Sequence, residues 1–213
     1  MFPFVLSLML NEVTKSWFKR SVQTIVFIPY FFSWAILAGM VLEIFAYDGV
    51  INNVLESLFG MEPIAFLVSN KYFRTIVIGS DVWKGMGYNT VLLLAAITNV
   101  DPTLHEAAQV DGAGRWKQML HVTLPGIMPM VAVLTVLGLG GILNAGFEQI
   151  LIMYNPTVEK TVDILDTLVY RLGMVSHQYS AAAAMGLFKS VISLLFVGTS
   201  YWILYKKSDY RVF

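Results

Sequence analysis

Long stretches without a single charged residue dominate this sequence. They occupy residues 21–42, 85–100, 118–147, 172–188 and 190–205. A helix needs roughly 20 mostly apolar residues to cross the hydrocarbon core of a bilayer. Several of the stretches reach that length alone, or with one charge tolerated. The sequence therefore predicts an all-α, polytopic membrane protein.

The composition narrows the functional classes. Only 13% of the residues are charged, and fourteen basic residues balance fourteen acidic ones, so the chain has no bulk field that attracts nucleic acid. It contains no cysteine, which excludes disulfides, thiolate metal sites and a cysteine nucleophile. Its five Trp, ten Tyr and fourteen Phe suit a chain that meets lipid and headgroups.

Four complete spanning helices and one partial helix are predicted. The complete helices are placed at 21–45, 74–98, 125–151 and 180–205. Residues 1–10 are apolar but cover only about half a bilayer, and no basic residue precedes them. We interpret them as the second half of a helix and not as a signal peptide. Loops are predicted at 46–73 and 155–179, and residues 162–173 look like a short amphipathic or re-entrant helix.

The distribution of basic residues predicts the orientation, because Lys and Arg are enriched on the cytoplasmic side. The segments 11–20 and 99–123 fall on the same side as the C-terminal tail. That side carries eight of the fourteen basic residues, namely Lys15, Lys19, Arg20, Arg115, Lys117, Lys206, Lys207 and Arg211. It carries five of the fourteen acidic residues, namely Glu12, Asp101, Glu106, Asp111 and Asp209. We therefore expect this side, and the C-terminus with it, to be cytoplasmic.

The polar segment 101–125 is predicted to form a compact helix–turn–helix on that face. Asp101 suits a helix cap and Pro102 suits the first helical position. The first helix should end near Val110, because the glycine-containing residues 111–114 give the backbone freedom to turn. A second short helix is expected at 115–122. The element is too polar for lipid and is shaped to dock into a groove of a cytoplasmic partner.

Residues in this segment follow a fixed spacing. Glu106-Ala107-Ala108 precedes Gly112, and Val122-Thr123-Leu124-Pro125 comes later. The pattern resembles the EAA loop of permease subunits in binding-protein-dependent ABC importers, where Ile is usual at the position of Val122. A capped break between two helices would not need Glu-Ala-Ala at this spacing.

The resemblance extends over nearly the whole chain. It points to the maltose-type permeases, and especially to the LplB-like oligosaccharide permeases. The residues that carry it are LNEV at 10–13, EPIAFL at 62–67, ILNAGFEQI at 142–150 and YSAAAAMGLFKS at 179–190. Such permeases normally have six helices. Residues 1–213 are therefore expected to be one permease domain that lacks its first helix and half of the second.

The resemblance implies a transporter subunit and not an enzyme. The EAA loop would be the coupling helix that sits on an ATP-hydrolysing subunit, through the residues Glu106, Ala107, Ala108, Asp111, Gly112, Leu124 and Pro125. The sequence has no phosphate-binding G-x-x-x-x-G-K-[ST] motif, so ATP should be bound by the partner and no cofactor or metal by this chain. The implied partners are a second homologous permease, ATP-binding cassette subunits, an extracytoplasmic solute-binding protein, the bilayer of a bacterial inner or plasma membrane, and a carbohydrate.

Polar residues inside the predicted spanning helices are candidates for a substrate path, because charges there are costly and usually face a cavity or a partner. Asp81, Lys84 and Tyr88 share one face of the helix 74–98. Trp83 and Asn89 lie on adjacent stripes. Tyr88 sits where the maltose-type permeases use a tyrosine. The alternative is that Asp81 and Lys84 simply pair near the membrane surface.

The helix after the loop contributes two more candidates. Asn144 and Glu148 are four residues apart and should share a face. The nearby glycines at 138, 140, 141 and 146 suit close helix packing, or unwinding at a binding site. Lys189 is expected either to neutralise Glu148 or to face the second permease. The three histidines, His105, His121 and His177, suggest only solvated or capping roles.

The sequence thus predicts the permease subunit of an ATP-driven importer for a sugar or oligosaccharide. Two other functions stay open. A permease for another solute, such as a peptide, would use the same loop, and the aromatic and amide content favours sugar only moderately. A passive channel or membrane scaffold would need no partner-docking loop.

Overall fold

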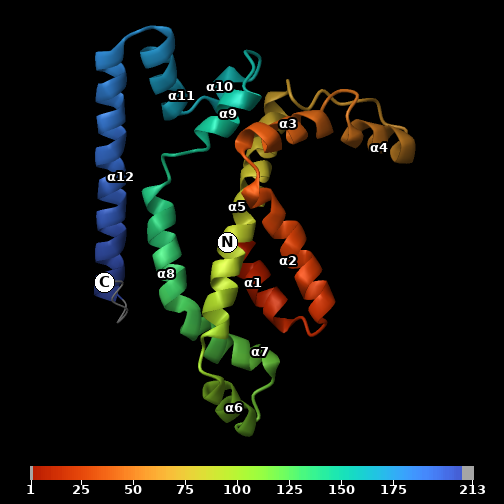
Figure 1. Cartoon of the computed structure of the whole chain (residues 1–213), viewed down its shortest axis with the longest axis vertical. Helices are drawn as coiled ribbons and strands as arrows, with labels where there is room; N and C mark the ends of the chain where they lie inside the picture. The colour runs from red at the N-terminus through yellow and green to blue at the C-terminus, as the bar shows by residue number, and fades with distance from the viewer. Residues whose placement is uncertain (1, 208–213) are drawn as a thin grey trace. The chain divides into compact units, whose positions relative to one another are not determined.

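The computed structural model describes residues 2–207, which form helices joined by loops and contain no strand (Figure 1). The helices are α1 (Phe2–Glu12), α2 (Ser16–Phe31), α3 (Trp34–Ile44), α4 (Val50–Phe59), α5 (Asn70–Thr98), α6 (Pro102–Val110), α7 (Arg115–Gln118), the π-turn η1 (Met119–Thr123), α8 (Leu124–Gly140), α9 (Phe147–Met153), α10 (Glu159–Val162), α11 (Leu165–Tyr170), the π-turn η2 (Arg171–Val175) and α12 (Tyr179–Lys207). The prediction of an all-α protein is confirmed for these residues.

Two compact units share the chain. Within the described residues, unit 1 comprises 2–27, 85–142 and 191–207, and unit 2 comprises 28–84 and 143–190. The helices α2, α5 and α12 contribute residues to both units.

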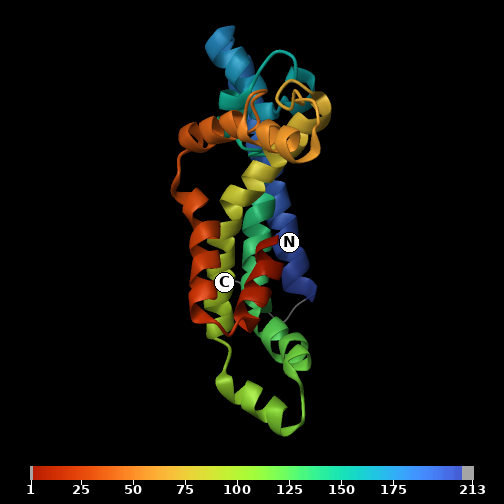
Figure 2. The same ribbon diagram turned by 90° about the vertical axis from the view of Figure 1, so that its right-hand side faces the viewer.

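Unit 1 is a helical bundle built from α1, α8, the first part of α2 and the C-terminal parts of α5 and α12 (Figure 2). Its buried core consists of Leu10, Leu94, Ile97 and Ile127. These side chains join α1, α5 and α8 around one apolar centre. The segment that leads from α5 through α6 and α7 to α8 also belongs to this unit.

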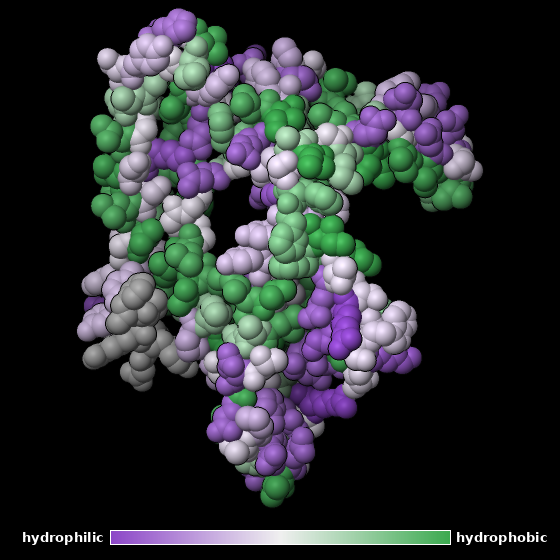
Figure 3. All heavy atoms as spheres, viewed as in Figure 1, coloured by the Kyte–Doolittle hydropathy of each residue, from purple (hydrophilic) through white to green (hydrophobic). Residues whose placement is uncertain are grey.

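Unit 2 packs α3, α9 and α10 against the N-terminal half of α5. Its buried core consists of Ala38, Val41, Phe73, Ile76, Val77, Ile150, Met153, Val158 and Val162. The short helix α4 lies within the predicted loop 46–73 and was not foreseen. Asn52 of α4 is buried, donates hydrogen bonds to the carbonyl oxygens of Ala46 and Ile64, and accepts one from the Ile64 amide. Seen from one face, α4 has a hydrophilic and a hydrophobic side (Figure 3).

The predicted continuous helix 21–45 is wrong, because the chain bends by 112° between α2 and α3. Pro29 lies inside α2 near its end and cannot donate a backbone hydrogen bond. Ser33 then has an extended backbone, and its hydroxyl accepts a hydrogen bond from the Ile36 amide at 3.4 Å. This is an N-cap, which starts α3 in a new direction.

The predicted helix 125–151 is also interrupted. The first part, α8, ends at Gly140, and α9 starts only after Gly146. Gly146 has a φ of 68°, a left-handed conformation that favours glycine. A side chain there would also crowd the Gln149 side chain, since a Cβ would lie 3.0 Å from its Oε1 atom.

The second short helix predicted at 115–122 is not a separate element. Residues Arg115–Gly140 form one continuous 26-residue helix that passes through the π-turn η1. The π-turn accommodates the backbone before Pro125, because the Leu124 amide donates to the Met119 carbonyl five residues back. Proline has no amide hydrogen to continue the ordinary ladder at the next position.

By length and composition, two helices in the described part of the chain can cross a membrane, namely Arg115–Gly140 and Tyr179–Lys206. A third is added if the bent pair α2 and α3 forms one span. The helix α5 is long enough at 29 residues, but its first half carries Lys71, Arg74, Asp81 and Lys84. The predicted count of four complete spans stays a prediction.

Candidate functional site

The segment that links α5 to α8 has the caps predicted from its sequence. The Asp101 carboxylate accepts a hydrogen bond from the Thr103 amide at 2.9 Å, and this bond lowers the pKa of Asp101. Pro102 occupies the first turn of α6, and Asp111 caps its end. Gly112 then adopts a φ of 74°, and the Ala113 amide returns to the Ala108 carbonyl at 2.8 Å. This left-handed turn reverses the chain between α6 and α7.

The helix α6 has no buried residue. Glu106 and Ala107 are exposed and Ala108 is half-buried. Three large apolar side chains of the segment also face outward: Leu104 is 52% exposed, Val110 88% and Trp116 69%. An otherwise hydrophilic segment that exposes such side chains is typical of a surface that binds a partner (Figure 3). Leu124 and Pro125 come after this segment in the chain, in the first turn of α8.

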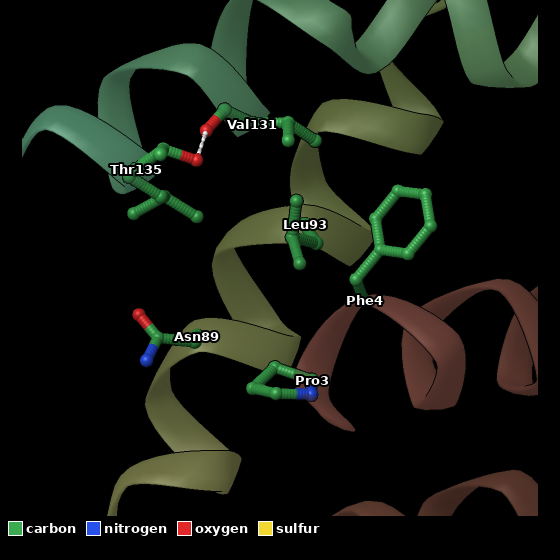
Figure 4. Close-up of a pocket in the computed structure, with 7 residues that line it drawn as sticks. Pro3, Phe4, Asn89, Leu93, Val131 and Thr135 are labelled. Carbon is green, nitrogen blue, oxygen red and sulfur yellow. Dashed lines mark hydrogen bonds between the residues drawn. The ribbon is translucent and has the colours of Figure 1, made fainter. Parts of the chain in front are cut away.

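A cavity of about 330 Å³ lies in unit 1 between α1, α5 and α8 (Figure 4). Its walls are mainly apolar and include Phe4, Leu93 and Val131. Two polar side chains line it, Asn89 from α5 and Thr135 from α8. The Asn89 amide donates only a long hydrogen bond, 3.3 Å, to the Gly85 carbonyl, so its polar group is weakly engaged by the protein.

The other residues predicted on α5 fall into different surroundings. Tyr88 is 43% exposed, next to Asn89 in the chain. Trp83 lines a mostly apolar cavity of about 410 Å³ in unit 2, together with Phe45 and Phe66. Asp81 lines another cavity of unit 2, of about 390 Å³.

Lys84 does not form an ion pair with Asp81 within the described part of the chain. Its ammonium group donates to the carbonyl oxygen of Phe32 and lies 5.1 Å from the centre of the Trp34 ring. Both residues flank the break between α2 and α3. Lys84 therefore stabilises that break, where the last carbonyl groups of α2 lack partners.

The prediction that Asn144 and Glu148 share one helix face is wrong. Asn144 lies in the break between α8 and α9, where its backbone carbonyl accepts from the Gly146 amide at 2.8 Å, and Glu148 is in the first turn of α9. Both side chains are exposed. Lys189 pairs with Asp166 and not with Glu148.

Sequence reasoning did not select Gln149 or Arg74, which accompany Asp81 around its cavity. Gln149 is 1% exposed, and its amide donates to the Val77 carbonyl and the Ser80 hydroxyl, both at 2.8 Å. These bonds fix α9 against α5. Arg74 sits in the charged first half of α5, where sequence reasoning used it only as the start of the predicted helix.

The chain belongs to the family of inner membrane components of binding-protein-dependent transport systems, whose model matches residues 1–206. Among its relatives in Bacillus subtilis (strain 168), LplB is 43% identical over 209 residues, and the polygalacturonan/rhamnogalacturonan transport system permease protein YteP is 42% identical over 195. The alignments cover 97% and 92% of this chain. The chain spans 65% and 61% of the length of these two relatives.

Solved structures resemble it closely. A bacterial ABC transporter involved in the import of the acidic polysaccharide alginate contains a chain that superposes with a TM-score of 0.93 at 41% identity. The superposition covers 98% of this chain and 73% of that one. A second structure of the alginate transporter, in complex with an alginate pentasaccharide-bound periplasmic protein, matches with a TM-score of 0.92.

Proposed function

We propose that this chain is the permease subunit of an ATP-driven importer that moves an oligosaccharide into the cell. The observation that carries the proposal is the exposed segment α6–α7, with its left-handed turn at Gly112 and its EAA residues. The family match and the relatives' printed functions in sugar transport support the class of solute. They do not favour a peptide permease or a passive channel.

In this proposal α6 docks on a separate ATPase subunit. Glu106 and Ala107 face outward on α6, while Leu104, Val110 and Trp116 supply apolar contact area. The helix that starts at Arg115 continues through η1 into α8 without a break. A displacement of the docked segment is therefore transmitted directly along a helix that is long enough to cross the membrane.

The remaining subunits follow from the same scheme. We infer a second homologous permease, two ATP-binding cassette subunits and an extracytoplasmic solute-binding protein, and the alginate transporter complexed with its periplasmic protein supports the last of these. ATP would be bound by the cassette subunits, with no cofactor in this chain. Four spanning helices with α6 and the C-terminus in the cytoplasm agree with the excess of basic over acidic residues there. Two of the charged residues in that count, the acidic Asp209 and the basic Arg211, lie outside the described residues.

A matched pair of glycine variants tests the docking role. Gly112→Val should abolish sugar uptake and sugar-stimulated ATP hydrolysis, because valine is strained at a φ of 74° and the turn is lost. Gly114→Val introduces the same side chain two residues later, at a φ of −67° with open space around it, and should leave both activities intact. The measurement is uptake and hydrolysis in reconstituted complexes, corrected for permease content. Equal activity of the two variants would contradict the docking role.

A further inference from the structure

The cavity beside Asp81 has a charged group at each end of its α5 wall. Arg74 and Asp81 both line it, seven residues apart on the same helix. At ~1.5 Å per residue, this spacing separates their backbones by about 10 Å along the helix. The wall between them is apolar, with Val77 and Ile78 from α5. The cavity has a volume of about 390 Å³, which is within the range of small-molecule sites.

The opposite wall comes from α9 and the end of α10. It contributes the apolar side chains of Ile150 and Val162 and the hydroxyl of Thr161. The Thr161 hydroxyl is already bound to the Asn70 side chain at 2.5 Å, and the Gln149 amide is bound to α5. The two sides of the cavity are thus held by hydrogen bonds within unit 2, and the space between them is preformed.

Arg74 is the cationic group of this cavity that the protein leaves available. Asp163 also lines the cavity, but its two carboxylate oxygens accept from Arg171 at 2.9 and 2.5 Å. Arg74 forms no ion pair with any residue of the described part of the chain. A guanidinium group is a rigid fork of donors that matches a carboxylate in two parallel hydrogen bonds. Asp81, at the other end, only accepts hydrogen bonds when it is ionised.

We propose that this cavity binds an acidic sugar, a uronate, with its carboxylate on Arg74 and a hydroxyl group of the same or the next ring donating to Asp81. The apolar wall between them suits the flat, CH-rich face of a sugar ring. A neutral sugar would leave the guanidinium without a counter-charge. The inference deepens the proposed import function and rests on it. It assigns the solute a negative charge and identifies Arg74 as the residue that recognises this charge.

The test compares an acidic solute with a neutral one in the complete transporter. Permease pair, ATPase and binding protein are reconstituted in proteoliposomes, and uptake is measured for uronate trisaccharides (galacturonate and mannuronate) and for their methyl esters, which keep the ring geometry and remove the charge. Because the binding protein is the same throughout, a change in the ratio of acidic to neutral uptake between variants reports on the permease.

Arg74→Gln should reduce uronate uptake about tenfold or more, as expected for the loss of a charge-assisted pair, and reduce methyl ester uptake much less. Arg74→Lys should retain part of the preference, since it keeps the charge and loses the fork. The matched control is Lys160→Gln, which removes a positive charge from exposed α10 without touching the cavity. Permease content in the vesicles is measured in every case.

Three results are distinguishable. Equal losses for acidic and neutral sugars in Arg74→Gln would overturn the assignment of a carboxylate to Arg74. Uptake of the esters but of no uronate by the parental transporter would overturn the acidic class while leaving sugar import standing. Uptake of no sugar of either kind would contradict the proposed import function itself.

Discussion

The side-chain amide of Gln149 in α9 donates a 2.8 Å hydrogen bond to the hydroxyl of Ser80 in α5, 69 residues earlier in the chain. Gln149 is 1% exposed, and its second hydrogen bond goes to the Val77 carbonyl. The pair therefore anchors the short helix α9 on the half of α5 that carries Arg74 and Asp81. These two hydrogen bonds hold the α9 wall of the cavity against its α5 wall.

Replacing Gln149 should lower the stability of unit 2 without changing any exposed side chain. Gln149→Leu removes the two hydrogen bonds that its amide donates to the Val77 carbonyl and the Ser80 hydroxyl, and we expect a loss of roughly 1–2 kcal/mol in stability, seen as a lower thermal unfolding midpoint of the purified protein in detergent. Gln178→Leu makes the same change at an exposed position and is the control. Equal midpoints for the two variants would mean that the buried amide contributes nothing.

The Asp163–Arg171 pair makes the segment of α10 and α11 sensitive to acid. The hydrogen bonds from Arg171 hold the pKa of Asp163 below its ordinary value. A carboxyl whose folded pKa is lowered contributes stability above its unfolded pKa, about 3.9, and loses that contribution as the pH falls through the folded value. Both side chains are 33% exposed, so the contribution should be under about 1 kcal/mol.

This predicts a pH-dependent difference between the parental protein and Asp163→Asn. The variant should unfold at a lower temperature at pH 7, and the two midpoints should converge as the pH falls below about 4. Asp48→Asn removes a carboxylate from an exposed position with no ion pair in the described part of the chain and is the control. A difference that stays constant over the whole pH range would point to packing and not to charge.

The long helices could be predicted from sequence because apolar length is a property of neighbouring residues. The helices α5 and α12 begin and end within a few residues of the predicted positions. The break at Ser33 was missed, because the chain stays apolar across it and composition does not report a change of direction. At Gly146, unwinding was one of the two roles considered for the glycines, but the predicted helix still ran through it. At Ser33 the signal was available in the sequence: Pro29 followed by a residue type that caps helices.

The polar contacts of the site could not be predicted in this way. Asn52 bonds to Ile64 and Gln149 to Val77, across 12 and 72 residues, and only the fold brings them together. For Lys84 the sequence offered a place in the substrate path or, as the alternative, an ion pair with Asp81, the nearest acid on the same helix face. The structure instead gives it the Phe32 carbonyl, which exists as an unsatisfied acceptor only because α2 ends there.

Topology can be tested cleanly because the chain has no native cysteine. Single cysteines at Ser57 in α4 or at Thr157 before α10 should react with a membrane-impermeant maleimide from outside intact cells. Cysteines at Gln118 in α7 or at Ser208, which lies outside the described residues, should react only after permeabilisation. Labelling of Gln118→Cys in intact cells would reverse the proposed orientation.

Charge reversal tests the docking surface independently of the backbone. Glu106 is exposed on α6, so Glu106→Lys should fold and reach the membrane while repelling a surface that is matched to a carboxylate. We expect sugar-stimulated ATP hydrolysis to fall about tenfold, as for the loss of a charge-assisted contact. Glu56→Lys on exposed α4 is the matched control and should hydrolyse ATP normally. Full activity of Glu106→Lys would exclude this side chain from the coupling contact.

The last prediction concerns the polar residues that meet a solute in transit. Asn89 lines the cavity of unit 1 with an amide that makes one long hydrogen bond, so it can exchange that bond for a sugar hydroxyl at little cost. Tyr88, the preceding residue in the chain, is 43% exposed and has an aromatic ring of the kind that stacks on sugars, and Asn144 exposes an amide in the break before α9. Transit requires weak contacts, because a tight site would trap the solute.

We therefore expect Asn89→Ala, Tyr88→Ala and Asn144→Ala each to reduce uptake severalfold without weakening capture of the sugar by the external binding protein. Part of the ATP hydrolysis should persist, since the segment α6–α7 is unchanged. Thr98→Ala alters an exposed residue at the end of the same helix α5 and is the control. The decisive measurement is uptake by assembled complexes, corrected for permease content. If all three variants transport at the parental rate, these side chains serve packing, and the solute passes along other residues of the two units.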